Sequence, residues 1–75
     1  MTEPRIYMRH ARQAARRPGG VTCAGGIRAW CAHNRISLTA FRTEGVAGEL
    51  ALQIGDAFAL AALEVARREA QSRGR

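Results

Sequence analysis

Two cysteines and two histidines are the side chains best suited to metal binding or nucleophilic chemistry: Cys23, Cys31, His10 and His33. Zinc sites normally use cysteine pairs with two to four residues between them, and Cys23 and Cys31, with seven between them, do not fit that pattern. A catalytic cysteine needs a neighbouring base, but on a helix His33 points about 200° away from Cys31. The sequence therefore predicts no metal, no cofactor and no enzymatic activity, with buried free thiols and surface histidines.

The arginines form the second group with chemical potential, because they account for all twelve basic residues. Guanidinium groups bind phosphates and carboxylates in bidentate geometry. Five of them lie in the first 20 residues beside a single acid, Glu3, and are candidate contacts to phosphate or to an acidic partner: Arg5, Arg9, Arg12, Arg16 and Arg17. Tyr7 is a candidate for stacking on a base, and Trp30 for anchoring a partner. The alternative is a solvated face with no ligand.

Charge is segregated along the chain, whose formal net charge is +6. Residues 1–20 carry a net charge of +4 and residues 67–75 a net charge of +3, whereas residues 36–66 carry −3. Basic ends could contact nucleic acid without sequence preference, since phosphate contacts need only positive charge. The acidic middle argues against contacts of that kind there.

The first 20 residues allow two interpretations. Pro4 suits the first turn of a helix, and Arg5, Arg9, Arg12 and Arg16 would then form one stripe. The run Pro18-Gly19-Gly20 would end that helix. A partly disordered arm is the alternative, and we divide the chain into a basic arm, 1–20, and a helical domain, 21–75.

Helical signals are clearer after residue 21. Thr22 is a candidate N-cap for a helix over 22–34, and Asn34 is a candidate stop. Ser37 is a candidate N-cap for a short helix that Gly45 ends in the left-handed conformation. A second short helix is expected over 47–54. Asp56 is the candidate N-cap of the longest helix, which begins at residue 57 and continues into the basic C-terminal end.

These elements predict an all-α fold, a small bundle of three or four helices. Large apolar residues begin at Ile27, so the core is expected in the last two thirds of the chain, with Phe58, Leu60 and Leu63 inside it. A chain of 75 residues buries only about 60% of its unfolded surface, so a partner or self-association could add stability. No apolar run is long enough to cross a membrane, and no signal peptide is recognisable.

The two short helices, 37–44 and 47–54, have the arrangement of a helix-turn-helix. The second would be the recognition helix, but it offers Glu49 and Gln53 and contains no arginine. Phosphates would repel such a helix, so sequence-specific reading of the major groove is not expected.

Several motifs along residues 6–68 resemble a group of short proteins encoded in bacteriophage and prophage genomes, among virion structural and assembly genes. The motifs are a Tyr-Met-Arg-His start, a Cys-x-x-Gly-x-Arg-x-Trp helix, a Phe-x-x-x-Gly turn and a Gly-Asp-Ala helix start. The matching residues are Tyr7, Met8, Arg9, His10, Cys23, Gly26, Arg28, Trp30, Phe41, Gly45, Gly55, Asp56 and Ala57. The chain departs from the pattern by inserting residues 14–20 before the cysteine-containing helix.

The resemblance implies a phage-derived, non-enzymatic protein and assigns no site residue. We therefore expect a small interaction protein, an accessory in virion assembly, whose partner is a phage structural protein or a second copy of the chain. The alternative is a nonspecific nucleic-acid-binding protein that acts through its arginine-rich ends. The expected location is the cytoplasm of the host cell, with attachment to the virion left open.

Overall fold

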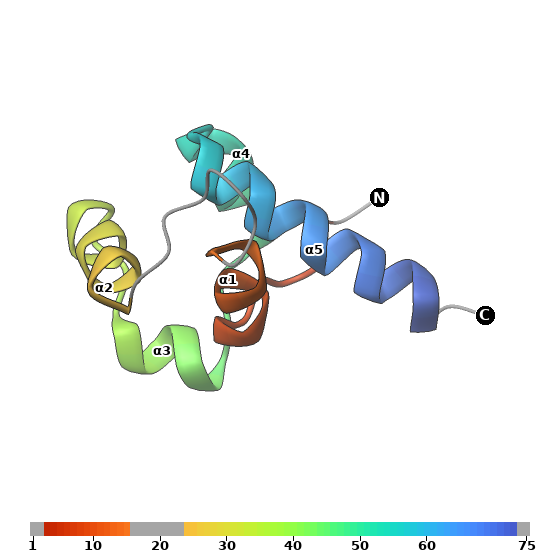
Figure 1. The fold of residues 1–75 in the computed structure, drawn as a ribbon, viewed down its shortest axis with the longest axis horizontal. Coiled ribbons are helices and arrows are strands. Elements are labelled where there is room, and N and C mark those ends of the chain that lie inside the picture. Colours follow the sequence, from red (N-terminus) through yellow and green to blue (C-terminus); the bar gives the residue numbers. More distant parts are fainter. Residues whose placement is uncertain (1–2, 16–23, 74–75) are drawn as a thin grey trace.

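The computed structural model describes residues 3–15 and 24–73, and these residues form five helices and no strand. The helices are α1 (Met8–Ala15), α2 (Ala24–His33), α3 (Leu38–Thr43), α4 (Gly48–Ile54) and α5 (Ala57–Arg73) (Figure 1). The predicted all-α fold is confirmed, with five helices where three or four were expected. The predicted N-cap residue Thr22 lies outside the described residues, and so does Cys23.

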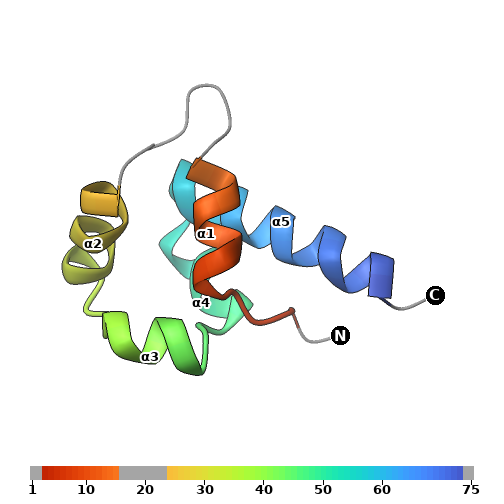
Figure 2. The same ribbon diagram turned by 60° about the horizontal axis from the view of Figure 1, so that its bottom comes forward.

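The longest helix, α5, is the base on which α1 and α4 pack (Figures 1 and 2). The contact between α1 and α5 is rich in alanine, with Ala11 and Ala14 buried on α1 and Ala59, Ala62 and Ala66 buried on α5. Short side chains let two helices approach closely and pack at high density. Alanine therefore contributes to this small core in a way that a count of large apolar residues does not show.

The expectation that the core begins at Ile27 is wrong. Ile6 is 3% exposed, and Ala11, Ala14 and Ala15 are buried in the same cluster as Phe41 and Leu63. Residues 3–15 are therefore part of the domain and not a separate basic arm. The sequence did not predict this burial, because alanines and one isoleucine among many arginines form only a weak apolar pattern.

The first helix does not begin at Pro4. The N-terminal segment, residues 3–7, is extended, and Ile6 forms an isolated antiparallel bridge with Val46. The two backbone hydrogen bonds measure 2.7 and 2.8 Å. Arg5 is therefore outside the helix that carries Arg9 and Arg12, and the predicted stripe loses its first member. Long-range pairing of this kind leaves no periodic signal in the sequence.

Three predicted caps are confirmed. The Ser37 hydroxyl accepts a hydrogen bond from the Ala40 backbone N–H at 3.3 Å, and the Asp56 carboxylate accepts one from Ala59 at 2.7 Å. Gly45 has φ 76°, the left-handed region that favours glycine. These local signals depend on neighbouring residues alone, which explains why the sequence contained them.

The helix α2 joins the bundle through aromatic contacts. The Trp30 ring lies edge-on to Phe58, with ring centroids 5.1 Å apart, and 6.4 Å from the ring of Phe41. The Trp30 indole N–H also donates to the Asp56 carboxylate at 2.9 Å, so one aspartate caps α5 and holds α2. Within the described residues, no helix is long and apolar enough to cross a bilayer.

Candidate functional sites: paired and unpaired arginines

The extended N-terminal segment lies across the loop between α3 and α4, and there Arg5 binds two backbone carbonyls. Its guanidinium donates to the backbone carbonyls of Glu44 at 2.7 Å and of Gly45 at 3.0 Å. These carbonyls belong to the C-terminal end of α3, where a cation is favoured by the unsatisfied carbonyl groups. Arg5 therefore acts as a cap inside the molecule.

Two glycines make room for this segment. A Cβ at Gly48 would lie 2.5 Å from both the Glu3 Cβ and the Pro4 carbonyl oxygen. A Cβ at Gly45 would lie 2.8 Å from the Tyr7 ring and 2.9 Å from the Ile6 carbonyl oxygen. Because backbone atoms of the segment occupy these positions, any larger residue would push the segment away from the loop.

Glu3 ties the same segment to α5 and α4. Its carboxylate receives two hydrogen bonds from Arg67, at 2.8 and 2.7 Å, in the bidentate geometry that suits guanidinium groups. The bidentate contact holds the pKa of the Glu3 carboxyl below its usual value. The Glu3 backbone N–H donates to Glu49 on α4 at 3.1 Å. The single acid of the basic N-terminal end is thus a structural contact.

His10 closes the first turn of α1 from inside. The Tyr7 backbone N–H donates to His10 Nδ1 at 2.9 Å, and the Tyr7 carbonyl accepts from the His10 backbone N–H at 2.9 Å. This is a reciprocal cap in which histidine occupies the position usual for glutamate. Because Nδ1 accepts this hydrogen bond, Nε2 is the ring nitrogen that lies near Glu69. The prediction of a surface histidine is wrong here, since His10 is 3% exposed.

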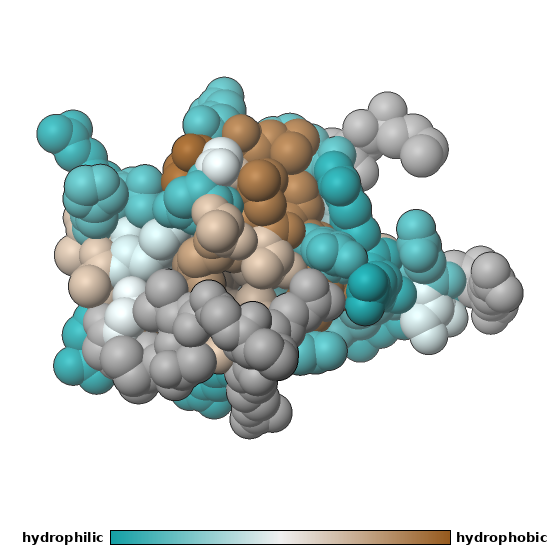
Figure 3. Space-filling model, turned by 45° about the horizontal axis from the view of Figure 1, so that its top comes forward, coloured by the Kyte–Doolittle hydropathy of each residue, from teal (hydrophilic) through white to brown (hydrophobic). Residues whose placement is uncertain are grey.

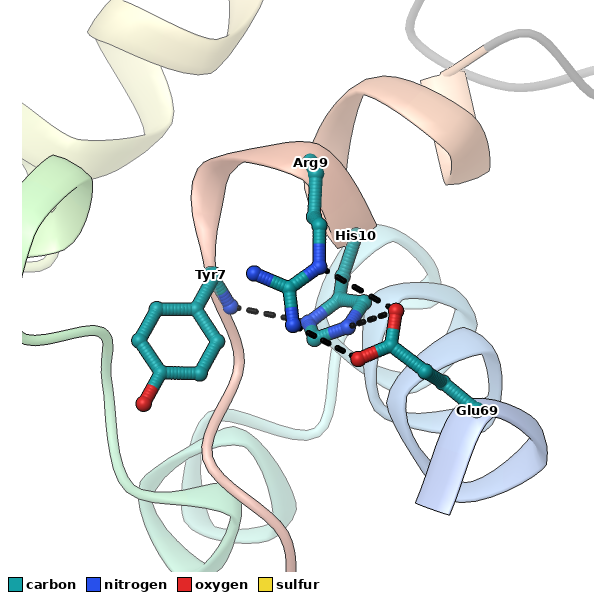
Figure 4. A network of polar contacts seen from close by, with 4 residues as sticks. All are labelled: Tyr7, Arg9, His10 and Glu69. Carbon is teal, nitrogen blue, oxygen red and sulfur yellow. Dashed lines mark hydrogen bonds and ion pairs between the residues drawn. The ribbon is translucent and has the colours of Figure 1, made fainter. Parts of the chain in front are cut away.

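Glu69 of α5 joins this cap to Arg9 (Figure 4). Arg9 donates to both carboxylate oxygens, at 2.6 and 3.1 Å, and His10 Nε2 lies 3.2 Å from one of them without the alignment of a good hydrogen bond. The Arg9 hydrogen bonds, with a smaller contribution from His10, lower the pKa of Glu69 to about 2. The Arg9 guanidinium also lies 4.8 Å from the centroid of the Tyr7 ring.

A groove of about 240 Å³ runs beside this network and is lined by Pro4, Arg5, Tyr7, Arg9, His10, Ala66, Glu69, Ala70 and Arg73. Its arginines are not equivalent, because Arg5 and Arg9 already bind the carbonyls and carboxylate described above. The Glu69 carboxylate also places negative charge in the groove wall. An anion entering here would compete with contacts that hold the fold.

A second, smaller pocket of about 40 Å³ has a different lining. This arginine pocket is formed by Met8, Arg12, Ile27, Arg28, Leu38 and Arg42. The three arginines among its described lining residues come from α1, α2 and α3, and all three are exposed. They make no hydrogen bond or ion pair with other described residues, whereas Arg9, Arg67 and Arg68 each pair with a glutamate. No acidic side chain lines this pocket.

The predicted site residues therefore separate in space. Arg5, Arg9 and Tyr7 lie at the groove on α5, while Arg12 lies at the arginine pocket with Arg28 and Arg42, which the sequence did not single out. Arg16 and Arg17 lie outside the described residues. Only the packing of three helices brings Arg12, Arg28 and Arg42 together, and their spacing in the sequence contains no signal for it.

Trp30, the predicted partner anchor, is only partly exposed, and its ring and indole N–H are occupied by Phe58 and Asp56. Large apolar exposure occurs elsewhere, at Leu52 on α4 and Leu60 on α5, which are 46% and 44% exposed. The expectation that Leu60 belongs to the core is wrong. Hydrophobic side chains gather over α4 and the start of α5 (Figure 3), and we call Leu52 and Leu60 the apolar patch.

The described thiol, Cys31, is 2% exposed, and burial raises its pKa. A buried thiol with a raised pKa stays protonated and is a poor nucleophile. His33 is exposed, and among the described residues no three histidine, cysteine or acidic side chains gather to hold a metal ion. Cys31 thus serves as a small apolar core residue.

Comparison of the chain with models of protein families, with curated proteins and with solved structures found no match.

Proposed function

We propose that this chain is a small, non-enzymatic interaction protein that docks onto a protein partner through the apolar patch of α4 and α5. The proposal rests on the exposure of Leu52 and Leu60. Close to half of each residue is exposed to solvent, in a chain with few large apolar residues. Apolar side chains left in water at one place favour association, because burial of their surface is favourable.

The charge around the patch favours a partner other than a second copy. The stretch that contains both leucines, residues 36–66, has a net charge of −3, and its acidic residues Glu49 on α4, Asp56 before α5 and Glu64 in the middle of α5 are exposed. A two-fold dimer through this patch would bring two acidic surfaces together. A partner with an apolar surface edged by basic side chains would fit better. An accessory role in virion assembly, proposed from the sequence resemblance, is compatible with such docking.

The test begins with the oligomeric state. In sedimentation experiments we expect a monomer for the native chain and for the double variant Leu52→Ser/Leu60→Ser. A native dimer that the variant loses would assign the patch to self-association and contradict the proposal.

The partner can be found by placing a photo-crosslinking residue at Leu52 in cells that express the chain, with exposed Ala32 on α2 as the control position. The protein that crosslinks to position 52 and not to position 32 is then purified. We expect the double serine variant to bind it at least about tenfold more weakly, the scale of a lost interface anchor. Unchanged affinity with a folded variant would contradict the proposal.

A further inference from the structure

The arginine pocket carries an inference that is independent of the apolar patch. Arg12, Arg28 and Arg42 line one small pocket without a counter-charge, although the chain pairs Arg9, Arg67 and Arg68 with glutamates elsewhere. Like charges held near one another on an apolar floor repel and are poorly solvated on that side. An anion from another molecule would remove this repulsion.

The chain itself has no acidic side chain to spare for the pocket. All six aspartates and glutamates are among the described residues, and the stretches 1–2, 16–23 and 74–75 contain none. Glu3, Glu64 and Glu69 pair with arginines elsewhere, and Asp56 binds the Trp30 indole N–H. None of the six lines the pocket. An anion that binds in the pocket would therefore come from another molecule.

The geometry favours a phosphate over a carboxylate. Three guanidinium groups carry three positive charges, which a single carboxylate cannot neutralise, whereas a nucleic-acid backbone presents a row of phosphates whose oxygens suit arginine forks. The volume of about 40 Å³ exceeds the space of ~10–15 Å³ that one water needs and leaves room for a small polyatomic anion. The apolar floor of Met8, Ile27 and Leu38 strengthens each charged contact by lowering the local dielectric constant.

We propose that the arginine pocket binds a backbone phosphate of a nucleic acid without reading its sequence. A polyanion fits the wider charge pattern, because the chain carries a net charge of +6. A backbone presents phosphates on its outer surface, where an open pocket can reach one while neighbouring cations contact the next. Arg12, Arg28 and Arg42 are the contact residues.

The direct test is fluorescence anisotropy of a labelled random 20-base-pair duplex, titrated at several salt concentrations. It compares the native chain with the triple variant Arg12→Gln/Arg28→Gln/Arg42→Gln. The control is Arg35→Gln/Arg68→Gln/Arg73→Gln, which removes the same charge and changes no residue of the arginine pocket. All six positions are exposed, and circular dichroism checks that each variant is folded.

We expect the pocket variant to lose at least about tenfold more affinity than the control, and its log K against log[salt] slope to flatten by roughly 0.9 per lost phosphate contact. Equal losses of affinity in the two variants would show that net charge alone accounts for binding, and would overturn the proposal. Absence of native binding at 0.05 M salt would also overturn it.

Two competitors at matched ionic strength identify the source of the anion. We expect neither inorganic phosphate nor polyglutamate to displace the duplex at concentrations where an unlabelled duplex does. Displacement by millimolar inorganic phosphate would assign the pocket to a free phosphate, and displacement by polyglutamate would assign it to an acidic peptide. Either result overturns a nucleic-acid backbone as the ligand. The apolar patch is unchanged in every variant, so failure here leaves the proposed protein docking intact.

Discussion

Arg9 and Arg12 lie three residues apart on one helix and have opposite surroundings. Arg9 binds Glu69 through two hydrogen bonds and lies over Tyr7, so it joins α1 to α5. Arg12 lines one pocket with Arg28 and Arg42, and no described acidic side chain lines that pocket. The role of an arginine in a basic stretch therefore depends on the side of the helix on which it lies. Arg9 lies toward α5 and pairs with an acid there, whereas Arg12 lies toward α2 and α3 and has no partner among the described residues.

The same contrast separates two sides of the molecule. On the α5 side, the N-terminal segment is held by a backbone bridge, by Arg5 on helix-end carbonyls and by Glu3 on Arg67. On the α2–α3 side, exposed arginines from three helices surround a small depression. The contacts that hold the N-terminal segment therefore lie on the first side, and the arginines without a partner among the described residues lie on the second.

The largest effect is expected where the N-terminal segment meets the α3–α4 loop. Gly48→Ala should destabilise the fold by about 1–3 kcal/mol, because the new Cβ would overlap the Glu3 Cβ and the Pro4 carbonyl. Hydrogen exchange at the Ile6 amide, which bonds to Val46, should accelerate. Gly55→Ala is the control, since its penalty comes from a φ of 70° and not from the segment. Equal protection of Ile6 in both variants would show that the segment is not held there.

The second effect concerns the acid dependence of stability. The pKa of Glu69 is lowered to about 2 by Arg9, so its ionised form stabilises the fold fully above about pH 4.5, and this contribution is lost as the pH falls toward 2. Glu69→Gln should lower Tm at pH 6 and flatten the decline of Tm between pH 5 and pH 2. Glu3→Gln, which removes the other arginine-bound carboxylate with a lowered pKa, should flatten the decline separately. If Tm depends on pH in Glu69→Gln as it does in the native chain, the contact between Arg9 and Glu69 does not stabilise the fold.

The smallest effect compares the two arginines directly. Arg9→Gln should lower Tm at neutral pH because it leaves Glu69 without its bidentate partner. Arg12→Gln should change the free energy of unfolding by no more than about 0.5 kcal/mol, since it breaks no contact between described residues and removes repulsion in the pocket. Thermal denaturation at low and high salt measures both. A larger fall for Arg12→Gln than for Arg9→Gln would reverse the comparison.

Local sequence determined much of the helical framework. Ser37 and Asp56 cap their helices by accepting hydrogen bonds from residues three positions on, and Gly45 supplies the left-handed turn after α3. Phe58 and Leu63 are core residues as expected. Each of these features depends on side chains within one or two turns, so the one-dimensional pattern contained the necessary information.

The candidate sites were not predictable in the same way. Arg5 was expected either on a helix or in a partly disordered arm and lies in an extended segment that pairs with Val46. His10 was expected at the surface and closes a buried cap. Arg28 and Arg42 belong to the arginine pocket although neither was singled out, because their position beside Arg12 comes from the packing of α1, α2 and α3.

The sequence by itself determined an all-α chain, most of its helix ends and its excess of positive charge, because caps, turns and composition act over short distances. Tertiary structure alone decided which charges are neutralised. Glu3 and Arg67 lie 64 positions apart, and Arg9 and Glu69 lie 60 apart, yet each pair is in direct contact. A guanidinium and a carboxylate bind according to their distance in space, and only the folded chain sets that distance.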